Sequence, residues 1–259
     1  MKILPKIILS VLALLLVGFG IYVYSQRENE PVTSEVTHMT PHTLKKQTET
    51  LSIDITYPTV PGEGKDVDSA NAFLKSEIDT QLALFQKDAD DSAQNTDIGL
   101  PANIKSSITG SGSVEEVNAR YASITMGTEW YIRGAAHPGH SMTTYIYDYK
   151  EKKFLSVEDL FTQGSDYLGL LSKLSKADLY EQSRSGDMGF SYDEGAVTDG
   201  TKPTKENFST VLPLKDGLAI YFGEYQVGPY AAGPQQVVIP YIKLRDVINK
   251  DGLLGMYIQ

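Results

Sequence analysis

The sequence predicts an α+β domain with a largely antiparallel sheet and two or three amphipathic helices, behind an N-terminal transmembrane helix. Few helical patterns lie among many strand patterns, and strands do not alternate regularly with long helices as they do in a doubly wound sheet. An apolar run near the start of the chain is separate from these patterns. The chain has no cysteine, but the roughly 210 residues after residue 50 suffice to bury a core without disulfides.

Residues 7–24 form an apolar run that contains only one serine and two glycines. This length just spans a hydrocarbon core of about 30 Å. A cleavable signal peptide is the alternative, but its apolar core is usually shorter and ends in a small-x-small site, which is missing here. Lys2 and Lys6 precede the run, so the positive-inside rule predicts a cytoplasmic stub (1–6), an uncleaved single-pass anchor (7–24) and a C-terminal domain outside the cytoplasm.

Residues 25–50 are polar, contain two prolines and have no sustained period, so they are predicted to form a flexible linker. His38 and His42 lie in this linker at a spacing that suits a metal only on a helix. Pro41 disfavours a helix there. We therefore interpret both as solvated histidines.

The chain carries 23 basic and 33 acidic residues, a net charge of −10. This balance argues against nucleic acid or anionic lipid as a partner. Solubility is the simplest explanation of the charge, although a basic protein or a cation would be attracted.

The first half of the folded part, residues 51–150, contains a helix between strands. The predicted elements are a half-buried strand over 51–57, a helix capped by Asp66 or Asp68 and closed by the polar tract 88–97, long strands over 113–133 and a strand over 142–149. The helix has an apolar stripe at three- and four-residue spacing, made of Val67, Ala70, Phe73, Leu74, Ile78, Leu82 and Phe85.

The second half, residues 151–259, begins with a turn at 151–153. Its predicted elements are a short helix capped by Ser156, an amphipathic helix from Asp166, strands over 208–214, 218–222 and 237–240, and a closing helix over 241–248. Ser183 to Lys205 is predicted to be a long loop, either mobile or functional. Its acids Asp187, Asp193 and Glu194 lack the spacing of a calcium loop and are interpreted as solvated.

Two groups of motifs resemble known families. Trp130–Pro138 (WYIRGAAHP), Tyr147–Lys150 (YDYK) and Phe154–Phe161 (FLSVEDLF) resemble the accessory domain of PdaC-type peptidoglycan deacetylases. Asn207-Phe208, Gly217–Phe222 (GLAIYF) and Tyr225–Tyr241 resemble the domain of unknown function that follows it in RsiV-type anti-sigma factors. The resemblance divides the folded part into a PdaC-accessory-like half (51–150) and an RsiV C-terminal-like half (151–259). The family usually has Gly-Gly-Ala-His-Pro where this chain has Gly134-Ala135-Ala136-His137-Pro138.

The resemblance implies an accessory module without the effector parts of either family. RsiV-like proteins hold a sigma factor through a cytoplasmic domain and sense lysozyme through the outer domain. PdaC-like enzymes carry a separate deacetylase domain with a metal-binding Asp and His motif. Neither part is expected in this sequence, which has four histidines.

The leading hypothesis is therefore a membrane-anchored binding module of the cell envelope that recognises wall glycan or a glycan-cleaving protein such as lysozyme. Two loops rich in Gly and Pro beside aromatic residues, Gly134 to His140 and Tyr225 to Gly233, are predicted to meet on one edge of the domain. Tyr131, His137, Tyr225 and Tyr230 are the predicted binding residues, because a ring with a polar tip suits a wet interface. Each tyrosine taken singly is explained more simply by packing within the sheet.

Two alternatives remain open. A metal-assisted hydrolase of cell-wall glycan would use His137 and His140, with Glu129 or Asp148 completing a metal site or acting as general base. The spacing fits no standard zinc motif and no Gly-x-Ser-x-Gly elbow is present, so no catalytic residue, metal ligand or cofactor is predicted and an enzyme is disfavoured. An envelope scaffold is the other alternative, and the sequence does not separate it from a binding module.

Overall fold

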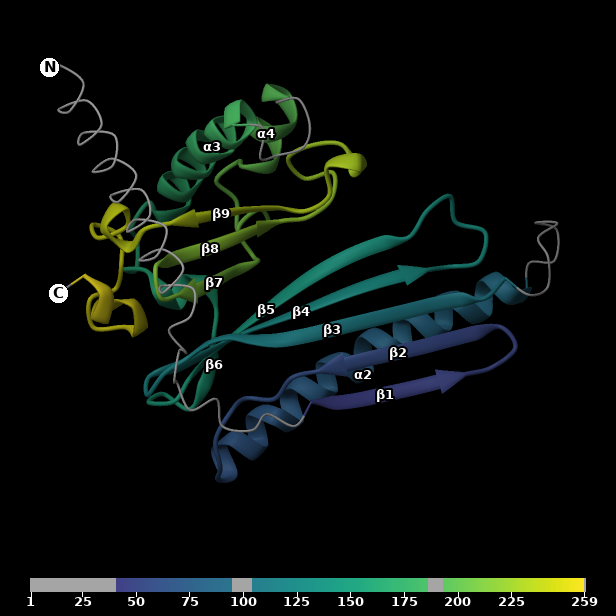
Figure 1. Ribbon diagram of the computed structural model, residues 1–259. Coiled ribbons are helices and arrows are strands. Elements are labelled where there is room, and N and C mark those ends of the chain that lie inside the picture. Colours follow the sequence, from purple (N-terminus) through teal and green to yellow (C-terminus); the bar gives the residue numbers. More distant parts are fainter. Residues whose placement is uncertain (1–40, 95–103, 186–192, 259) are drawn as a thin grey trace, which may run out of the picture. The chain divides into compact units, whose positions relative to one another are not determined.

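Residues 51–57, with their apolar alternation, form the second strand of a six-stranded sheet in the computed structural model, which describes residues 41–94, 104–185 and 193–258 (Figure 1). The strands follow one another in chain order: β1 (His42–Gln47), β2 (Leu51–Tyr57), β3 (Ser106–Val117), β4 (Tyr121–Tyr131), β5 (Gly139–Asp148) and β6 (Lys153–Leu155). β2 and β3 pair in parallel, and the other neighbours pair antiparallel.

Helix α2 (Lys65–Gln94) makes the crossover between the parallel strands and covers one face of the sheet (Figure 1). The predicted stripe faces the sheet, and Ala89 extends it. Phe73 is the exception, because it lies to the side of the stripe, is 43% exposed and stacks on Phe154 at the sheet edge (ring centroids 5.1 Å apart). The helix also begins at Lys65, before both of the predicted caps, and continues through most of the polar tract.

A second, three-stranded antiparallel sheet consists of β7 (Val211–Leu214), β8 (Gly217–Phe222) and β9 (Gln235–Ile239). Helix α3 (Tyr167–Ser185) packs along β9, and α4 (Glu194–Gly200) packs on α3 (Figure 1). Short 3-10 turns complete this half: η2 (Val157–Leu160), η3 (Tyr230–Ala232), η4 (Tyr241–Lys243) and η5 (Leu253–Tyr257). The predicted α+β class with a mostly antiparallel sheet is confirmed for the described residues.

The two sheets share one core. Tyr121 and Ile146 of the large sheet are buried in the same apolar cluster as the side chains of β7, β8 and β9. Across this junction the hydroxyls of Tyr121 and Tyr257 share a hydrogen bond (2.6 Å), and the buried Ser123 hydroxyl donates to the carbonyl of Pro213 (2.5 Å). The small sheet therefore covers part of the large-sheet face opposite α2 and leaves the remainder of that face open.

Three predicted boundaries are wrong. Strand β1 lies inside the predicted linker, where His42 stacks on Tyr57 (ring centroids 5.3 Å apart). Helix α4 lies inside the predicted loop 183–205, because the Asp193 side chain accepts a hydrogen bond from the Ala196 amide and caps it. The closing helix over 241–248 is reduced to the turn η4.

The end of the predicted closing helix is instead held by the segment before α3. The Thr162 amide donates to the carbonyl of Val247, and its hydroxyl donates to the carbonyl of Ile248. Ile248 also forms an isolated bridge with Phe161. The two hydrogen bonds from Thr162 therefore occupy carbonyls that would accept from later amides if the helix continued.

The predicted anchor, His38 and most of the predicted linker lie outside the described residues. Within those residues, no helix is both long and apolar enough to cross a bilayer.

Candidate functional site

The loop between β4 and β5 meets the loop between β8 and β9, as the sequence predicts. The His137 ring lies 4.3 Å from the Tyr230 ring and 6.3 Å from the Tyr225 ring, measured between centroids. The Tyr230 hydroxyl donates to the Pro138 carbonyl (3.2 Å), and the Tyr225 hydroxyl lies 3.4 Å from Nε2 of His137. His137, Tyr225 and Tyr230 thus form one aromatic cluster.

Tyr225 is the displayed member of this cluster. Its side chain is 61% exposed and its backbone is left-handed (φ 62°), a conformation that costs a non-glycine residue on the order of 1 kcal/mol. Gln226 holds the turn, because its side-chain oxygen accepts from the Gly223 amide (3.0 Å) and its side-chain nitrogen donates to the carbonyls of Gly200 and Asn207 (both 3.1 Å). The loop therefore presents Tyr225 on a fixed support.

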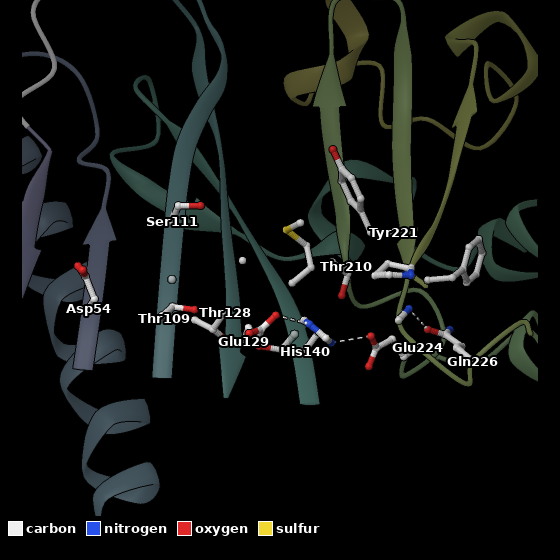
Figure 2. Close-up of a pocket in the computed structure, with 17 residues that line it drawn as sticks. Asp54, Thr109, Ser111, Thr128, Glu129, His140, Thr210, Tyr221, Glu224 and Gln226 are labelled. Carbon is white, nitrogen blue, oxygen red and sulfur yellow. Dashed lines mark hydrogen bonds and ion pairs between the residues drawn. The ribbon is translucent and has the colours of Figure 1, made fainter. Parts of the chain in front are cut away.

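His140, on β5, lies between two carboxylates from different parts of the fold (Figure 2). Nε2 donates to Oε2 of Glu129, its cross-strand partner on β4 (2.8 Å). Nδ1 lies 2.6 Å from Oε1 of Glu224, in the loop after β8. The Glu224 oxygen lies off the direction of the N–H bond, so this second contact is an ion pair without good hydrogen-bond alignment.

The carboxylates raise the pKa of His140. The hydrogen bond to Glu129 is the largest contribution, burial opposes it, and the charges of Glu224 and Glu129 add to it. The imidazolium therefore links the large sheet to the loop after β8.

This arrangement does not resemble a metal centre. Both ring nitrogens of His140 face carboxylate oxygens, whereas a metal ligand needs a free nitrogen lone pair. Nδ1 of His137 donates to the Pro138 carbonyl (2.7 Å). No group of three His, Asp or Glu side chains among the described residues is arranged to hold a metal ion.

Asp148, the other acid considered for a metal or base role, is a structural residue. It is buried, pairs with Arg120 (2.8 Å) and accepts from the amides of Lys150 and Glu151. It lies at the opposite end of β5 from His140.

An open groove of about 710 Å³ lies beside His140, between the uncovered face of the large sheet and β8 (Figure 2). Its lining comes from β2, β3, β4, β5 and β8, from the residue before β7 and from the loop after β8. It comprises Asp54, Thr109, Gly110, Ser111, Gly127, Thr128, Glu129, His140, Ser141, Met142, Thr210, Tyr221, Phe222, Gly223, Glu224, Gln226 and Pro234. We call this feature the groove.

The floor of the groove consists of small residues, two of which carry hydroxyls. Thr109 and Ser111 alternate along β3 on the uncovered face, and Gly127 lies directly opposite Ser111 on β4. A Cβ atom at Gly127 would lie 3.7 Å from the Ser111 carbonyl oxygen and 3.9 Å from the Met142 methyl, so the position has room for one. Met142 and Tyr221 add an apolar and an aromatic surface from β5 and β8.

The predicted residue Tyr131 does not join the aromatic cluster. Its hydroxyl accepts from the Gly134 amide (3.4 Å), and among the contacts of the described residues none joins its ring to those of His137, Tyr225 or Tyr230. Sequence reasoning missed Glu224 and the residues of the groove floor. Glu224 adjoins the predicted loop, but no motif marks it.

Comparisons with known proteins show similarity to a curated relative and to several solved structures, two of which are given below. The chain is 29% identical over 212 residues to the peptidoglycan-N-acetylmuramic acid deacetylase PdaC of Bacillus subtilis (strain 168). This match covers 80% of the chain but only 41% of the relative.

The solved structures share the fold. A DUF3298 family member from Bacteroides fragilis NCTC 9343 superposes with a TM-score of 0.59 at 18% identity, covering 82% of this chain and 93% of that one. A DUF3298 family protein from Pseudomonas aeruginosa PAO1 gives a TM-score of 0.53 at 16% identity, with 82% and 95% covered. The family model described as a protein of unknown function (DUF3298) matches residues 158–242. The chain therefore carries a DUF3298 domain, within an α+β fold that solved DUF3298 proteins share.

Proposed function

We propose that this protein is an extracytoplasmic binding module of the cell envelope that holds wall glycan in the groove. The observation that carries the proposal is the groove itself, a preformed hollow of about 710 Å³ with a polar floor and an aromatic wall. Sites for small ligands have volumes of about 300–1,000 Å³, so a few sugar rings fit.

The surface chemistry suits a sugar chain. A sugar ring has hydroxyls around its edge and apolar C–H faces. Thr109 and Ser111 offer hydroxyls across the floor, while Met142 and Tyr221 offer surfaces on which a ring face packs. The aromatic cluster adjoins the end of the groove at His140, whose ring lies 6.3 Å from that of Tyr230. A longer chain would continue over the exposed Tyr225.

The curated relative supports a wall-related role, since its name assigns it to peptidoglycan. The chain spans about two fifths of that relative, so the deacetylase activity is not carried over. We propose further that the apolar run at residues 7–24 anchors the module at the outer face of the cell membrane.

A substitution that fills the floor tests the proposal. Gly127→Val adds a β-branched side chain where strand geometry and space allow it, and should reduce binding to purified peptidoglycan at least about tenfold without lowering stability. Ser52→Val is the matched control, because Ser52 lies on the same sheet face but not in the groove lining. Equal binding by both variants, or no binding by the unmodified protein, would remove the groove as a glycan site.

A glycan-cleaving protein, such as a lysozyme-like enzyme, is a second candidate. It is favoured by the display of Tyr225, a mostly exposed ring held in a left-handed turn beside two other rings. An exposed aromatic anchor on a fixed loop is typical of protein interfaces, and its truncation costs about 1–3 kcal/mol. Tyr225→Ala should then weaken lysozyme binding strongly, whereas Gly127→Val should not. The opposite pattern would favour glycan.

A further inference from the structure

We propose that the groove selects glycan that carries free amino groups over fully N-acetylated glycan. The inference rests on the proposed glycan-binding function and specifies the ligand of that site. Its basis is the distribution of charge around the groove.

Carboxylates reach the groove from three different elements. Asp54 comes from β2, Glu129 from β4 and Glu224 from the loop after β8 (Figure 2). All lining residues belong to the described part of the chain, and none of them is lysine or arginine. A cleft with a net charge and walls of low dielectric concentrates its field, and three carboxylates against the one imidazolium of His140 leave the groove negative, so it attracts cations.

Local partners do not cancel this charge. His140 supplies one positive charge to two carboxylates, which leaves one negative charge in that group. Asp54 pairs with Lys45 (2.9 Å), but both side chains are about half or more exposed, and such a pair is weak in water. Lys45 also lies outside the groove lining. The carboxylates therefore remain available to a cationic ligand.

The two forms of an amino sugar differ in charge at one position. An N-acetyl group is neutral and offers a single N–H donor, whereas an ammonium group carries a positive charge and three donors. A charge-assisted hydrogen bond to a carboxylate is about twice as strong as a neutral one. The small floor residues let a ring approach the sheet, where its amino group lies within the field of the carboxylates.

The experiment compares two probes of equal length. Hexamers of glucosamine and of N-acetylglucosamine are titrated into the protein at about pH 5.5, where the amines and most carboxylates are charged. We expect the glucosamine hexamer to bind about tenfold tighter, with a preference that declines as salt is raised. Asp54→Asn should reduce the preference about threefold to fivefold.

Asp91→Asn is the matched control. Asp91 pairs with Lys87 on α2 (3.4 Å) and is 65% exposed, so its substitution also removes one surface ion pair, but it lies outside the groove lining. This variant should keep the full preference. A loss equal to that of Asp54→Asn would assign the preference to net charge and overturn the inference.

The other outcomes separate the inference from the function on which it rests. Equal binding of both hexamers would overturn the amine selectivity and leave glycan binding intact. Binding of neither would overturn both. A lysine tetramer tests whether the ammonium alone suffices. Its failure to bind supports a sugar ligand, and binding as tight as that of the glucosamine hexamer would show that the groove takes basic peptide instead.

Discussion

The His140 contacts should make the stability of the fold depend on pH in a defined direction. The perturbation is His140→Gln, which removes the imidazolium but keeps a polar side chain between Glu129 and Glu224. The folded protein raises the pKa of His140 above its value of about 6.5 in the unfolded chain, chiefly through Glu129. The stabilisation is therefore complete below about pH 6.5 and is lost as the pH rises through the raised folded pKa.

The size of this stabilisation follows from the exposure of the two carboxylates. The Glu129 side chain is 55% exposed, so its contact with His140 contributes only a few tenths of a kcal/mol after screening by water. Glu224 is 12% exposed, so water screens its charge less, but its contact with His140 is poorly aligned. Together they should contribute about 1 kcal/mol. For a domain of this size that is a shift in melting temperature of about 2–4 °C.

The assay is thermal unfolding of both proteins at about pH 5.5 and about pH 9. The difference between unmodified protein and His140→Gln should be largest at the lower pH and should shrink at the higher pH. Groups elsewhere titrate in both proteins and cancel in the difference. Glu224→Gln and the double variant complete a cycle that isolates the pair. A difference that is constant with pH, or that grows at high pH, would refute the ion-pair interpretation.

Three further substitutions test the packing. Tyr121→Phe should lower the free energy of unfolding by about 1 kcal/mol, because the partly buried Tyr257 hydroxyl loses its partner, and chemical denaturation that shows no loss would contradict this. Leu179→Ala should cost about 2–5 kcal/mol in the same assay, since Leu179 is fully buried in the shared core, and a loss below 1 kcal/mol would argue against that packing. Gly200→Ala should destabilise the protein and displace the loop that carries Tyr225, because its Cβ would lie 1.8 Å from the carbonyl oxygen of Gln226, and unchanged tyrosine fluorescence and melting would count against it.

The elements that bury one face were predictable from the sequence. Leu51 to Tyr57 alternate because one side of β2 contacts α2 and the other does not, and α2 repeats its apolar residues because one stripe covers the sheet. The alternation in β2 and the repeat of apolar residues in α2 each arise within one segment, because one side of that segment is buried. A single sequence therefore reveals both.

The elements that the sequence did not reveal bury little or end for non-local reasons. β1 is an edge strand whose only half-buried residue is Leu44, and its exposed Lys45 and Lys46 are typical of a protected edge. The segment 241–248 has helical spacing, yet its last carbonyls accept hydrogen bonds from Thr162, which is distant in the sequence. No pattern within either segment predicts these outcomes.

The candidate site was predictable only in part. The aromatic loops were marked by composition. Their meeting was expected because the two modules occur in tandem in the families that the sequence resembles, and loops that face apart would not act together. The groove was not predicted, because Thr109, Ser111 and Gly127 are ordinary strand residues until β8 is placed opposite them. Tyr131 lies next to the first aromatic loop in the sequence, but its hydroxyl accepts a hydrogen bond from the Gly134 amide.

The hydrogen bond between Tyr121 and Tyr257 affects where the borders of an expressed fragment should lie. Both tyrosines lie outside the DUF3298 match at residues 158–242, and so do the core residues Leu253 and Leu254. A fragment cut at the borders of the match would expose the apolar side chains that these residues cover. It would aggregate on expression, whereas one that begins before β1 and includes η5 keeps every contact described above. The borders of the family match thus differ here from the borders of the packed core.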